Sequence, residues 1–581
     1  MVGLNTGKAT WDGRFLRLAG RQSSPSGGLP QGAHPKFIAA RQYHLPEVRA
    51  IKMHRRKTHK QWILICLFGI LIGCGPEIES HSQNKLPSSA IEFPERTQLG
   101  QMATALAQSE QGKSGFLLLD RGSEALAWRL ILADAAEKTI DAQYFLWKND
   151  SAGKVLMQRL LAAADRGVRV RVMVDDSMTE PDPEYLAEFG AHPNVELRLY
   201  KPFGPKHKSV ALRWLNYAQD LKVLNQRMHN KSFIVDGSFA IVGGRNIANE
   251  YFEYPGPFVF RCRDLMALGP VVSSTNTAFD LYWNSDWTIP IEEVVDPVPS
   301  AQEDRSQWEQ LTGFAKDSAN YPVGFFDNPP ELKGRMKRLK SELFWGQGRL
   351  LVDAVPTLGG AHQSHRELHQ TSVELGKLMA QTSQEMQIET AYLILLEEGL
   401  DLLKQANDRG VKITLATNSL ASNNHVSAFV GYWKQRKKIL ETGAQLFEMR
   451  PDAASERALF TAEELAKYKT VFGLHCKTAV FDHKTVYVGS FNLDPRSVNL
   501  NSEMGFLVES SDLAKAVSAS IQKDLLPVNS WQVVMQPDGS VAWVTFENGK
   551  LTFETDTDPM VSKKRRAAAD LLLLVPMDSQ L

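Results

Sequence analysis

The stretch MHNKSFIVDGSFAIVGGRN, residues 228–246, returns much later in the chain as LHCKTAVFDHKTVYVGSFN, residues 474–492. In both copies a lysine follows a histidine by two residues, and an aspartate follows that lysine by five residues. An asparagine then stands 17 residues after each histidine. The residues are His229, Lys231, Asp236 and Asn246 in the first copy, and His475, Lys477, Asp482 and Asn492 in the second.

A second landmark is repeated at nearly the same spacing. The tetrapeptide DRGV at residues 165–168 recurs at residues 408–411, a displacement of 243 residues, while the histidine motif is displaced by 246. Two landmarks shifted by almost the same distance indicate one duplicated α/β unit. Each copy is expected to contain a strand, an amphipathic helix and another strand, at 139–147, 153–167 and 168–176, and again at 385–395, 398–410 and 411–419.

The composition is that of a globular protein with room for more than one domain. Of the 581 residues, 43% are hydrophobic and 23% are charged, and the formal net charge is zero. Such a chain can bury a large core, and it generates no overall field that would attract nucleic acid. A local basic patch would still be compatible with this charge balance.

The N-terminal part has the composition of a targeting segment. Residues 1–52 lack apolar periodicity, so we expect them to be disordered or, if translation starts at Met53, absent. Residues 53–73 contain a basic run and then a short apolar stretch, and the sequence LIGC at its end, residues 71–74, resembles a bacterial lipobox. The prediction is a lipoprotein lipidated at Cys74, anchored to the membrane and facing the periplasm of a Gram-negative bacterium. The alternative is an uncleaved apolar helix.

The rest of the chain divides by composition and by the repeat. The predicted parts are a linker at 74–110, a first repeat at 111–299, a connector at 300–380, a second repeat at 381–529, and a C-terminal β meander with a basic and apolar tail at 530–581. Two predictions for the tail remain open: a helix docked on the body of the protein, or a segment that rests on anionic lipid.

The repeated motif combines groups that suit a phosphate. Alternation along a strand places each histidine on the same face as its lysine. A lysine ammonium binds anionic oxygens, a histidine acts as nucleophile or acid and base near neutral pH, and the asparagines add uncharged donors. A single motif could be a surface lysine beside a core histidine, but two copies in register argue against this. Cys476 lies between His475 and Lys477 and is expected to be a packed thiol rather than a nucleophile.

These motifs resemble the phospholipase D superfamily, whose signature is this duplicated histidine, lysine and aspartate pattern. The supporting stretches include IDAQYFLW, VGGRNIANEYF and SFNLDPRSVNLNSEMG, and the resemblance covers residues 115–510. It is closest to bacterial cardiolipin synthases of the C type. The resemblance implies an α/β fold with two phospholipase D-like repeats. Each would be a mixed β-sheet flanked by helices, and the two would pack as a pseudo-dimer around one active-site cleft.

The resemblance also implies a mechanism without metal or other cofactor. His229 would attack phosphorus and form a phosphohistidine, and His475 would act as general acid and base. Lys231, Lys477, Asn246 and Asn492 would hold the phosphate oxygens. Asp236 and Asp482 complete the two motifs, and as strand-ending carboxylates they are expected to tie their turns. Asp264 and Glu503 are predicted to orient the two histidines.

The implied activity is synthesis of cardiolipin from phosphatidylglycerol and a second phospholipid, for which phosphatidylethanolamine is a candidate. The expected partners are therefore phospholipids and the membrane surface, and no nucleic acid; the oligomeric state stays open. Three alternatives remain at this point: hydrolysis in the same site, a nuclease, and a non-catalytic protein that binds membranes. Two complete motifs argue against the last of these, because binding alone does not need two histidines.

Overall fold

The computed structural model describes residues 85–176, 183–202, 225–295, 306–322, 325, 332–357 and 364–573. The predicted signal segment and Cys74 lie outside the described residues. Every element below belongs to the unit Pro76–Leu581.

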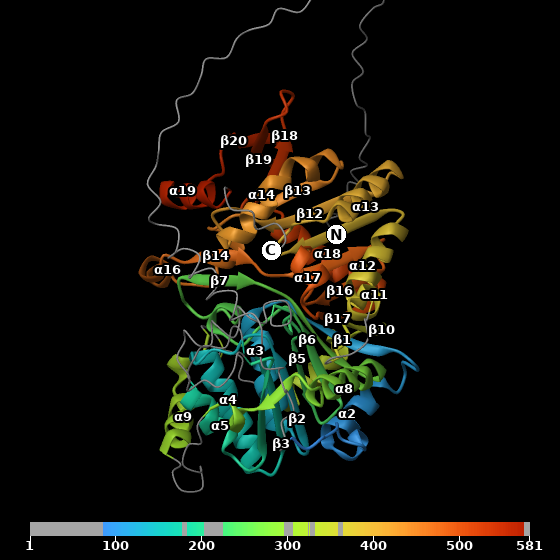
Figure 1. Cartoon of the computed structure of the whole chain (residues 1–581), viewed down its shortest axis with the longest axis vertical. Coiled ribbons are helices and arrows are strands. Elements are labelled where there is room, and N and C mark those ends of the chain that lie inside the picture. The colour runs from blue at the N-terminus through green and yellow to red at the C-terminus, as the bar shows by residue number, and fades with distance from the viewer. Residues whose placement is uncertain are drawn as a thin grey trace, which may run out of the picture. The chain divides into compact units, whose positions relative to one another are not determined.

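The first repeat forms a mixed sheet, shown in blue to green in the lower half of Figure 1. Across this sheet the hydrogen-bonded order is β9, β4, β3, β2, β5, β6, β8 and β1. Strands β2, β3 and β4 are parallel, and the other pairs are antiparallel. The bounds are β1 Ser114–Leu119, β2 Thr139–Tyr144, β3 Arg169–Asp175, β4 Val195–Tyr200, β5 Ser232–Val235, β6 Phe239–Gly243, β8 Asp264–Leu268 and β9 Thr288–Pro290.

The second repeat continues with the order β10, β17, β16, β15, β11, β12, β13, β18, β19 and β20. Again only the β11, β12 and β13 pairs are parallel within this sheet. The bounds are β10 Phe344–Val352, β11 Glu385–Thr390, β12 Lys412–Asn418, β13 Gln445–Met449, β15 Lys477–Phe481, β16 Thr485–Gly489, β17 Met504–Glu509, β18 Ser530–Met535, β19 Val541–Glu547 and β20 Lys550–Thr555.

The two halves are joined by an antiparallel pair between β1 and β10, with Ser114 opposite Gly346 and Phe116 opposite Phe344. On either side of this pair the strand order runs outward in the same way, through β8, β6, β5, β2, β3 and β4 in one half and β17, β16, β15, β11, β12 and β13 in the other. The structure therefore confirms the duplicated α/β architecture.

Strand β10 lies inside the range that the sequence predicts as a connector with a helix. Its sequence, FWGQGRLLV, gives no clear alternation, and glycine is unfavourable in strands. The glycines are needed here for close packing. A Cβ on Gly346 would lie 2.5 Å from the Glu509 carbonyl oxygen, and one on Gly348 would lie 2.5 Å from the Phe116 ring. A further difference is that the predicted linker 74–110 contains helix α2, which Thr97 caps by accepting from the Gly100 N–H.

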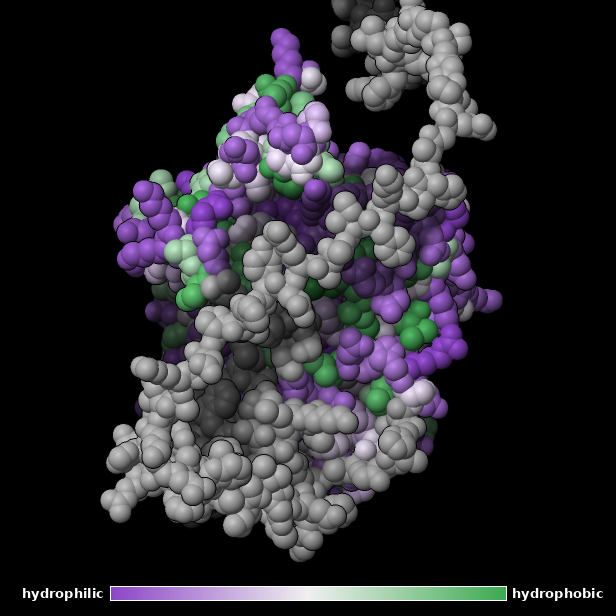
Figure 2. Space-filling view, turned by 45° about the horizontal axis from the view of Figure 1, so that its top comes forward, coloured by the Kyte–Doolittle hydropathy of each residue, from purple (hydrophilic) through white to green (hydrophobic). Residues whose placement is uncertain are grey.

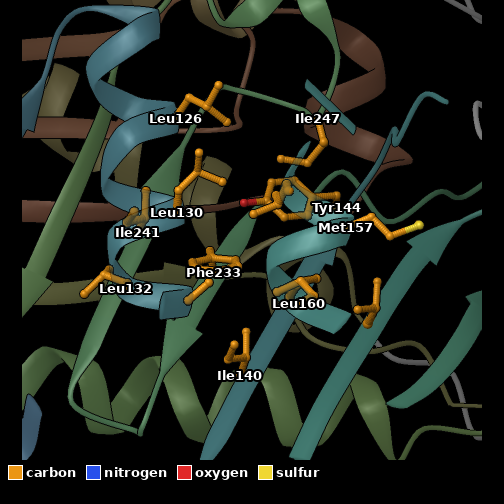
Figure 3. Packing of buried hydrophobic residues seen from close by; sticks show 14 of the residues in the cluster. Leu126, Leu130, Leu132, Ile140, Tyr144, Met157, Leu160, Phe233, Ile241 and Ile247 are labelled. Atoms are coloured by element: carbon orange, nitrogen blue, oxygen red, sulfur yellow. The ribbon is translucent and has the colours of Figure 1, made fainter. Parts of the chain in front are cut away.

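Helices cover the sheets and close the cores. In the first repeat, side chains from α3 and α4, such as Leu126, Leu130 and Leu160, pack against Phe233 and Ile241 of the sheet (Figure 3). The helix bounds are η1 Pro94–Arg96, α2 Gln98–Ala107, α3 Gly122–Ala135, α4 Ser151–Asp165, α5 Pro183–Gly190, η2 Asn249–Tyr251, α8 Pro270–Trp283, η3 Ile291–Glu293, α9 Ser306–Lys316, η4 Ser318–Asn320, α10 Leu332–Glu342, α11 His365–Leu368, α12 Gln370–Gln381, α13 Glu397–Asp408, α14 Val426–Glu441, α15 Ala454–Arg457, α16 Ala462–Tyr468, α17 Pro495–Asn499, α18 Ser511–Asp524 and α19 Lys563–Leu572.

A separate core holds the two repeats together. It combines apolar residues of both sheets, such as Val242 and Phe506, with residues of α8 and α18, such as Phe279 and Val517. A short parallel pair between β7, Phe258–Arg261, and β14, Val471–Leu474, also crosses from one repeat to the other at their junction (Figure 1).

The C-terminal part forms the predicted antiparallel meander from β18 to β20, and α19 follows it. Arg565 Nε donates to the Leu420 carbonyl oxygen at 2.6 Å, and Arg566 pairs with Asp558 at 3.2 Å. The described part of the tail is thus a helix docked on the body, while Lys563 and Lys564 stay exposed. None of the described helices has the length and apolar character that a bilayer crossing requires. On the face seen in Figure 2, hydrophobic residues form small groups among hydrophilic ones.

Candidate active site

Each motif histidine is hydrogen-bonded through its backbone to the other repeat. The His229 N–H donates to the Ser502 carbonyl oxygen at 2.9 Å, and the His475 N–H donates to the Arg261 carbonyl oxygen at 2.7 Å. His229 lies just before β5, and His475 follows β14 directly. The pairing of the repeats therefore places both histidines at the same junction.

His229 is held by a buried carboxylate. Its Nδ1 atom lies 2.8 Å from Oε2 of Glu503, a residue with no exposed surface. The hydroxyls of Ser490 and Ser497 both donate to the Glu503 carboxylate, the second at 2.8 Å. The ring of Phe145 packs edge-on against the imidazole, with centroids 5.0 Å apart. The sequence prediction placed Glu503 beside a histidine, and the structure brings it to His229.

His475 lies in a different environment. Its ring packs against those of Tyr251 and Phe260, with centroids 5.0 Å and 4.8 Å away. Lys477 Nζ lies 3.0 Å from the His475 Nδ1 atom and also donates to the His475 carbonyl oxygen at 3.0 Å. The sulfur of Cys262 is 3.9 Å from the same Nδ1 atom. Aromatic rings and a thiol therefore surround this imidazole, where His229 has a carboxylate.

Asp264 was predicted as an orienting residue, and the structure corrects this prediction. Its carboxylate accepts from Arg129 at 2.9 Å and from the backbone N–H of Arg245 at 3.2 Å. The reason is register. Asp264 pairs with Gly243 just as Gly505 pairs with Gly489, so the counterpart of Glu503 stands two residues before Asp264, at Cys262.

The two motif aspartates stabilise turns. Asp236 accepts from the backbone N–H groups that lead into β2, those of Glu137, Lys138 and Thr139, at 2.7 to 2.9 Å. Asp482 accepts in the same way before β11, from Ser383, Gln384 and Glu385, at 2.7 to 3.2 Å. Both aspartates adopt positive φ, 47° and 49°, a conformation that aspartate tolerates better than most residues. These contacts fix the hairpin that follows each histidine.

The lysines and asparagines of both motifs are buried beside the histidines. Lys231 Nζ donates to the His229 carbonyl oxygen at 2.6 Å. The Asn246 amide donates to the Tyr251 hydroxyl at 3.1 Å, whereas Oδ1 of the buried Asn492 has no hydrogen-bond partner among the described residues. The side chain of Asn492 thus has fewer hydrogen-bond partners among the described residues than that of Asn246.

Burial and mutual repulsion determine the charges of this cluster. Burial lowers the pKa of His229 well below its usual range, and the charges of Lys231 and Lys477 lower it further. Burial lowers the pKa of His475 in the same direction, with Lys477 next in effect. The pKa of Lys477 falls to about 8 because of burial, and burial raises the pKa of Glu503 to about 7. A bound anion would offset this repulsion and favour the protonated forms of the histidines and lysines.

The residues 130–265 and 375–525 match the family model described as cardiolipin synthase, PLD-like domain. Cardiolipin synthase C of Escherichia coli (strain K12) is 34% identical over 474 residues, which cover 81% of this chain and 97% of the relative. The chain belongs to the phospholipase D-like cardiolipin synthase family. An uncharacterized protein of Helicobacter pylori (strain ATCC 700392 / 26695) is 27% identical, covering 81% of this chain and 90% of its own. A solved phosphatidylserine synthase of Haemophilus influenzae Rd KW20 is 13% identical over 73% of this chain and 90% of its own, with a TM-score of 0.47.

Within this family member, sequence reasoning missed the residues that surround the motif. Ser490 and Ser497 lie 246 residues after Gly244 and Tyr251, so the repeat offset alone could have aligned them. The counterpart of Glu503 was harder to find. From Asn492 to Glu503 there are 11 residues, but from Asn246 to Cys262 there are 16, so the first repeat has five additional residues before its orienting position.

Proposed function

We propose that this protein makes cardiolipin by transferring a phosphatidyl group to phosphatidylglycerol from a second phospholipid, with phosphatidylethanolamine as a candidate donor. The observation that carries the proposal is the convergence of two histidine and lysine pairs at one junction, with Glu503 bonded to His229 Nδ1 at 2.8 Å. The family membership supports the same chemistry.

In the first step, Nε2 of His229 attacks phosphorus, and the bond from phosphorus to the headgroup oxygen breaks. His475 donates its proton to that oxygen, so the headgroup leaves as a neutral alcohol. The product is a phosphatidyl group on His229 Nε2. Its imidazolium keeps the proton on Nδ1, where the Glu503 carboxylate stabilises the positive charge. His475, which has no carboxylate partner among the described residues, gains no such stabilisation.

In the second step, the terminal hydroxyl of phosphatidylglycerol attacks the same phosphorus. His475 removes the hydroxyl proton, the new P–O bond forms, and the bond from phosphorus to Nε2 breaks. Lys231, Lys477, Asn246 and Asn492 would bind the nonbridging oxygens in both steps. A lysine that is buried beside another lysine binds an anion strongly, because the anion relieves the repulsion between them.

The predicted lipid anchor and the predicted boundaries of the parts of the chain also belong to the proposal. We infer that the protein works at a phospholipid surface, as a lipoprotein whose signal segment 53–73 is removed and whose Cys74 carries the lipid. The proposed parts are the linker 74–110, the repeats 111–299 and 381–529, the connector 300–380 and the C-terminal part 530–581. Comparing the wild type with Cys74→Ser by N-terminal mass and detergent partitioning tests the anchor. A wild-type chain that keeps residues 53–73 would overturn it.

The function is tested by mass spectrometry of lipids after incubation of the purified protein with vesicles of phosphatidylglycerol, with and without phosphatidylethanolamine. Cardiolipin and the released headgroup alcohol are expected in equal amounts. Cardiolipin formed from phosphatidylglycerol alone would identify a second phosphatidylglycerol as the donor. Release of phosphatidic acid without cardiolipin would show that the site is a hydrolase instead.

A further inference from the structure

The two histidines differ at three equivalent positions, and the three differences fit together. Strand pairing makes Cys262 the counterpart of Glu503, and the repeat offset makes Gly244 and Tyr251 the counterparts of Ser490 and Ser497. Around His229 there is thus a carboxylate that two hydroxyls hold in place. Around His475 the same positions provide a thiol, a hydrogen atom and an aromatic ring.

The packing shows that these residues depend on one another. A Cβ at Gly244 would lie 2.8 Å from the Cys262 sulfur, so the thiol fits because this position is glycine. The Tyr251 ring packs edge-on against His475, with the ring planes at 85°. Cys262 is 1% exposed, and burial raises the pKa of its thiol, which therefore stays neutral beside the imidazole. All three polar residues around His229, and not only Glu503, therefore have different counterparts around His475.

The electrostatic surroundings of His475 follow from this exchange. The charges that act most strongly on it are those of Lys477, Lys231, His229 and His425, and the contacting side chains of Cys262 and Tyr251 are neutral. None of these is a carboxylate, whereas Glu503 lies directly on Nδ1 of His229. An imidazolium at position 475 is therefore less stabilised by the protein than one at position 229.

We propose that Cys262 is a positioning residue for His475, and that its neutral thiol fixes the division of labour between the two histidines. Without a carboxylate partner, the His475 imidazolium is the stronger acid, so it donates the proton to the leaving alcohol. His229, with Glu503 behind it, becomes the nucleophile. This inference rests on the proposed transfer reaction and assigns the role of each histidine within it.

The test is the pH dependence of kcat for headgroup release in the wild type, Cys262→Asp and Cys262→Ser, because kcat reports the substrate complex, in which the bound phosphate anion favours the protonated form of His475. An aspartate carboxylate favours the His475 imidazolium and raises its pKa. The acid must be protonated to act, so the rate falls as pH rises through this pKa. The alkaline limb of Cys262→Asp is therefore expected to move up by about one pH unit. The limb of Cys262→Ser stays in place, because the hydroxyl is neutral. Equal limbs in Cys262→Asp and the wild type would overturn the proposal.

A second readout does not depend on the folding of the aspartate variant. Denaturing quench of the wild type during turnover at mildly alkaline pH, which preserves the acid-labile P–N bond, followed by peptide mass spectrometry, is expected to find the phosphatidyl adduct on the peptide with His229. An adduct on the peptide with His475 would overturn the division of labour. In Cys262→Asp, part of the adduct is expected to move to His475. These failures are distinct from failure of the proposed function, for which the wild type itself would make no cardiolipin.

Discussion

The two repeats are alike in the residues that hold the backbone and differ in the residues around the catalytic histidines. Asp236 and Asp482 bind three successive backbone N–H groups at the same place, and the strand order is the same in both halves. The surroundings of the histidines, in contrast, differ: one half has a carboxylate with two hydroxyls and the other has a thiol with aromatic rings. Duplication thus kept the residues that define the backbone, while the residues that tune the imidazoles changed.

The contact between the repeats is also asymmetric. Arg263 contributes a buried guanidinium that binds Glu389 and Asp524 of the second repeat and Asp120 of the first. Its counterpart across the pseudo-twofold relation is Met504, which lies in the shared apolar core. The same position in the two repeats therefore holds a buried guanidinium in one half and an apolar side chain in the other.

The largest effect is expected from the histidines themselves, and it separates the two repeats. His229→Ala and His475→Ala should each lower cardiolipin formation by about 10⁴-fold or more, because each removes a group that takes part in both steps. The difference lies in the adduct. His475→Ala still contains the nucleophile and should slowly accumulate a phosphatidyl adduct on His229, whereas His229→Ala should form none. The exposed His483 of the second hairpin provides the control, and His483→Ala should keep full activity. Full turnover in either motif variant would contradict the assignment.

The next effect concerns the carboxylate that only one half has. Glu503→Gln keeps the shape but loses the negative charge behind His229, and we expect a loss of at least about tenfold in kcat. The pKa of Glu503 is about 7, so the ionised, active form is lost as pH falls through 7. The wild-type rate should therefore decline below neutral pH, and Glu503→Gln should lose the Glu503 contribution to that decline. An unchanged acidic limb in the variant would mean that another group causes it.

The buried ion pairs of the interface should matter for stability more than for chemistry. Arg263→Met introduces the residue that the second repeat has at this position, but it leaves Glu389 buried without its partner. Loss of one member of a buried ion pair costs about 3–5 kcal/mol of unfolding free energy. Burial already raises the pKa of Glu389 to about 7, so its protonation offsets part of the loss. The destabilisation should therefore grow as pH rises above 7, which urea unfolding at pH 6 and pH 8.5 would measure. Arg349→Met removes an exposed pair with Glu374 and should change stability by less than about 1 kcal/mol.

The comparison also explains what the sequence could and could not predict. The offset of the motif predicted the duplicated fold, because the strand order depends on local patterns that both copies retain. The turn-tying role of the aspartates was also expected from the sequence, because each aspartate stands at the end of a strand. A residue that follows the motif closely could also be predicted to lie beside a histidine, as Glu503 shows.

Two kinds of feature could not be predicted, and both depend on pairing between distant strands. Strand β10 packs Gly348 against Phe116 of the first repeat and Gly346 against Glu509 of β17, and its sequence shows no alternation that would reveal this. The counterpart of Glu503 is displaced by five additional residues, so counting from the motif reaches Pro257 instead of Cys262, and the sequence prediction chose Asp264. In both cases the decisive fact is which residues lie opposite each other across the sheet, and a single sequence does not contain it.

The smallest effect should come from the two residues that the repeats share most closely. Asp236→Asn and Asp482→Asn both preserve a residue type that tolerates positive φ, so each loses only the charge that the N–H groups bind. Asp236 is fully buried, and we expect its variant to lose about 1.5–3 kcal/mol of unfolding free energy. Asp482 is partly exposed, so water replaces much of the loss, and we expect at most about 1 kcal/mol.

The pH dependence provides a further check on Asp482. Burial alone would raise its pKa, but the hydrogen bonds from Gln384 and Ser383 outweigh burial and hold the pKa below its usual range. A carboxylate with a depressed pKa stabilises the fold above its unfolded pKa, and this contribution is lost as pH falls through the folded value. The stability difference between the wild type and Asp482→Asn should therefore disappear in acid. Thermal unfolding between pH 7 and pH 3 measures it. A difference that persists at the acid end would show that the asparagine strains the turn, and that the two hairpins are less equivalent than their hydrogen bonds indicate.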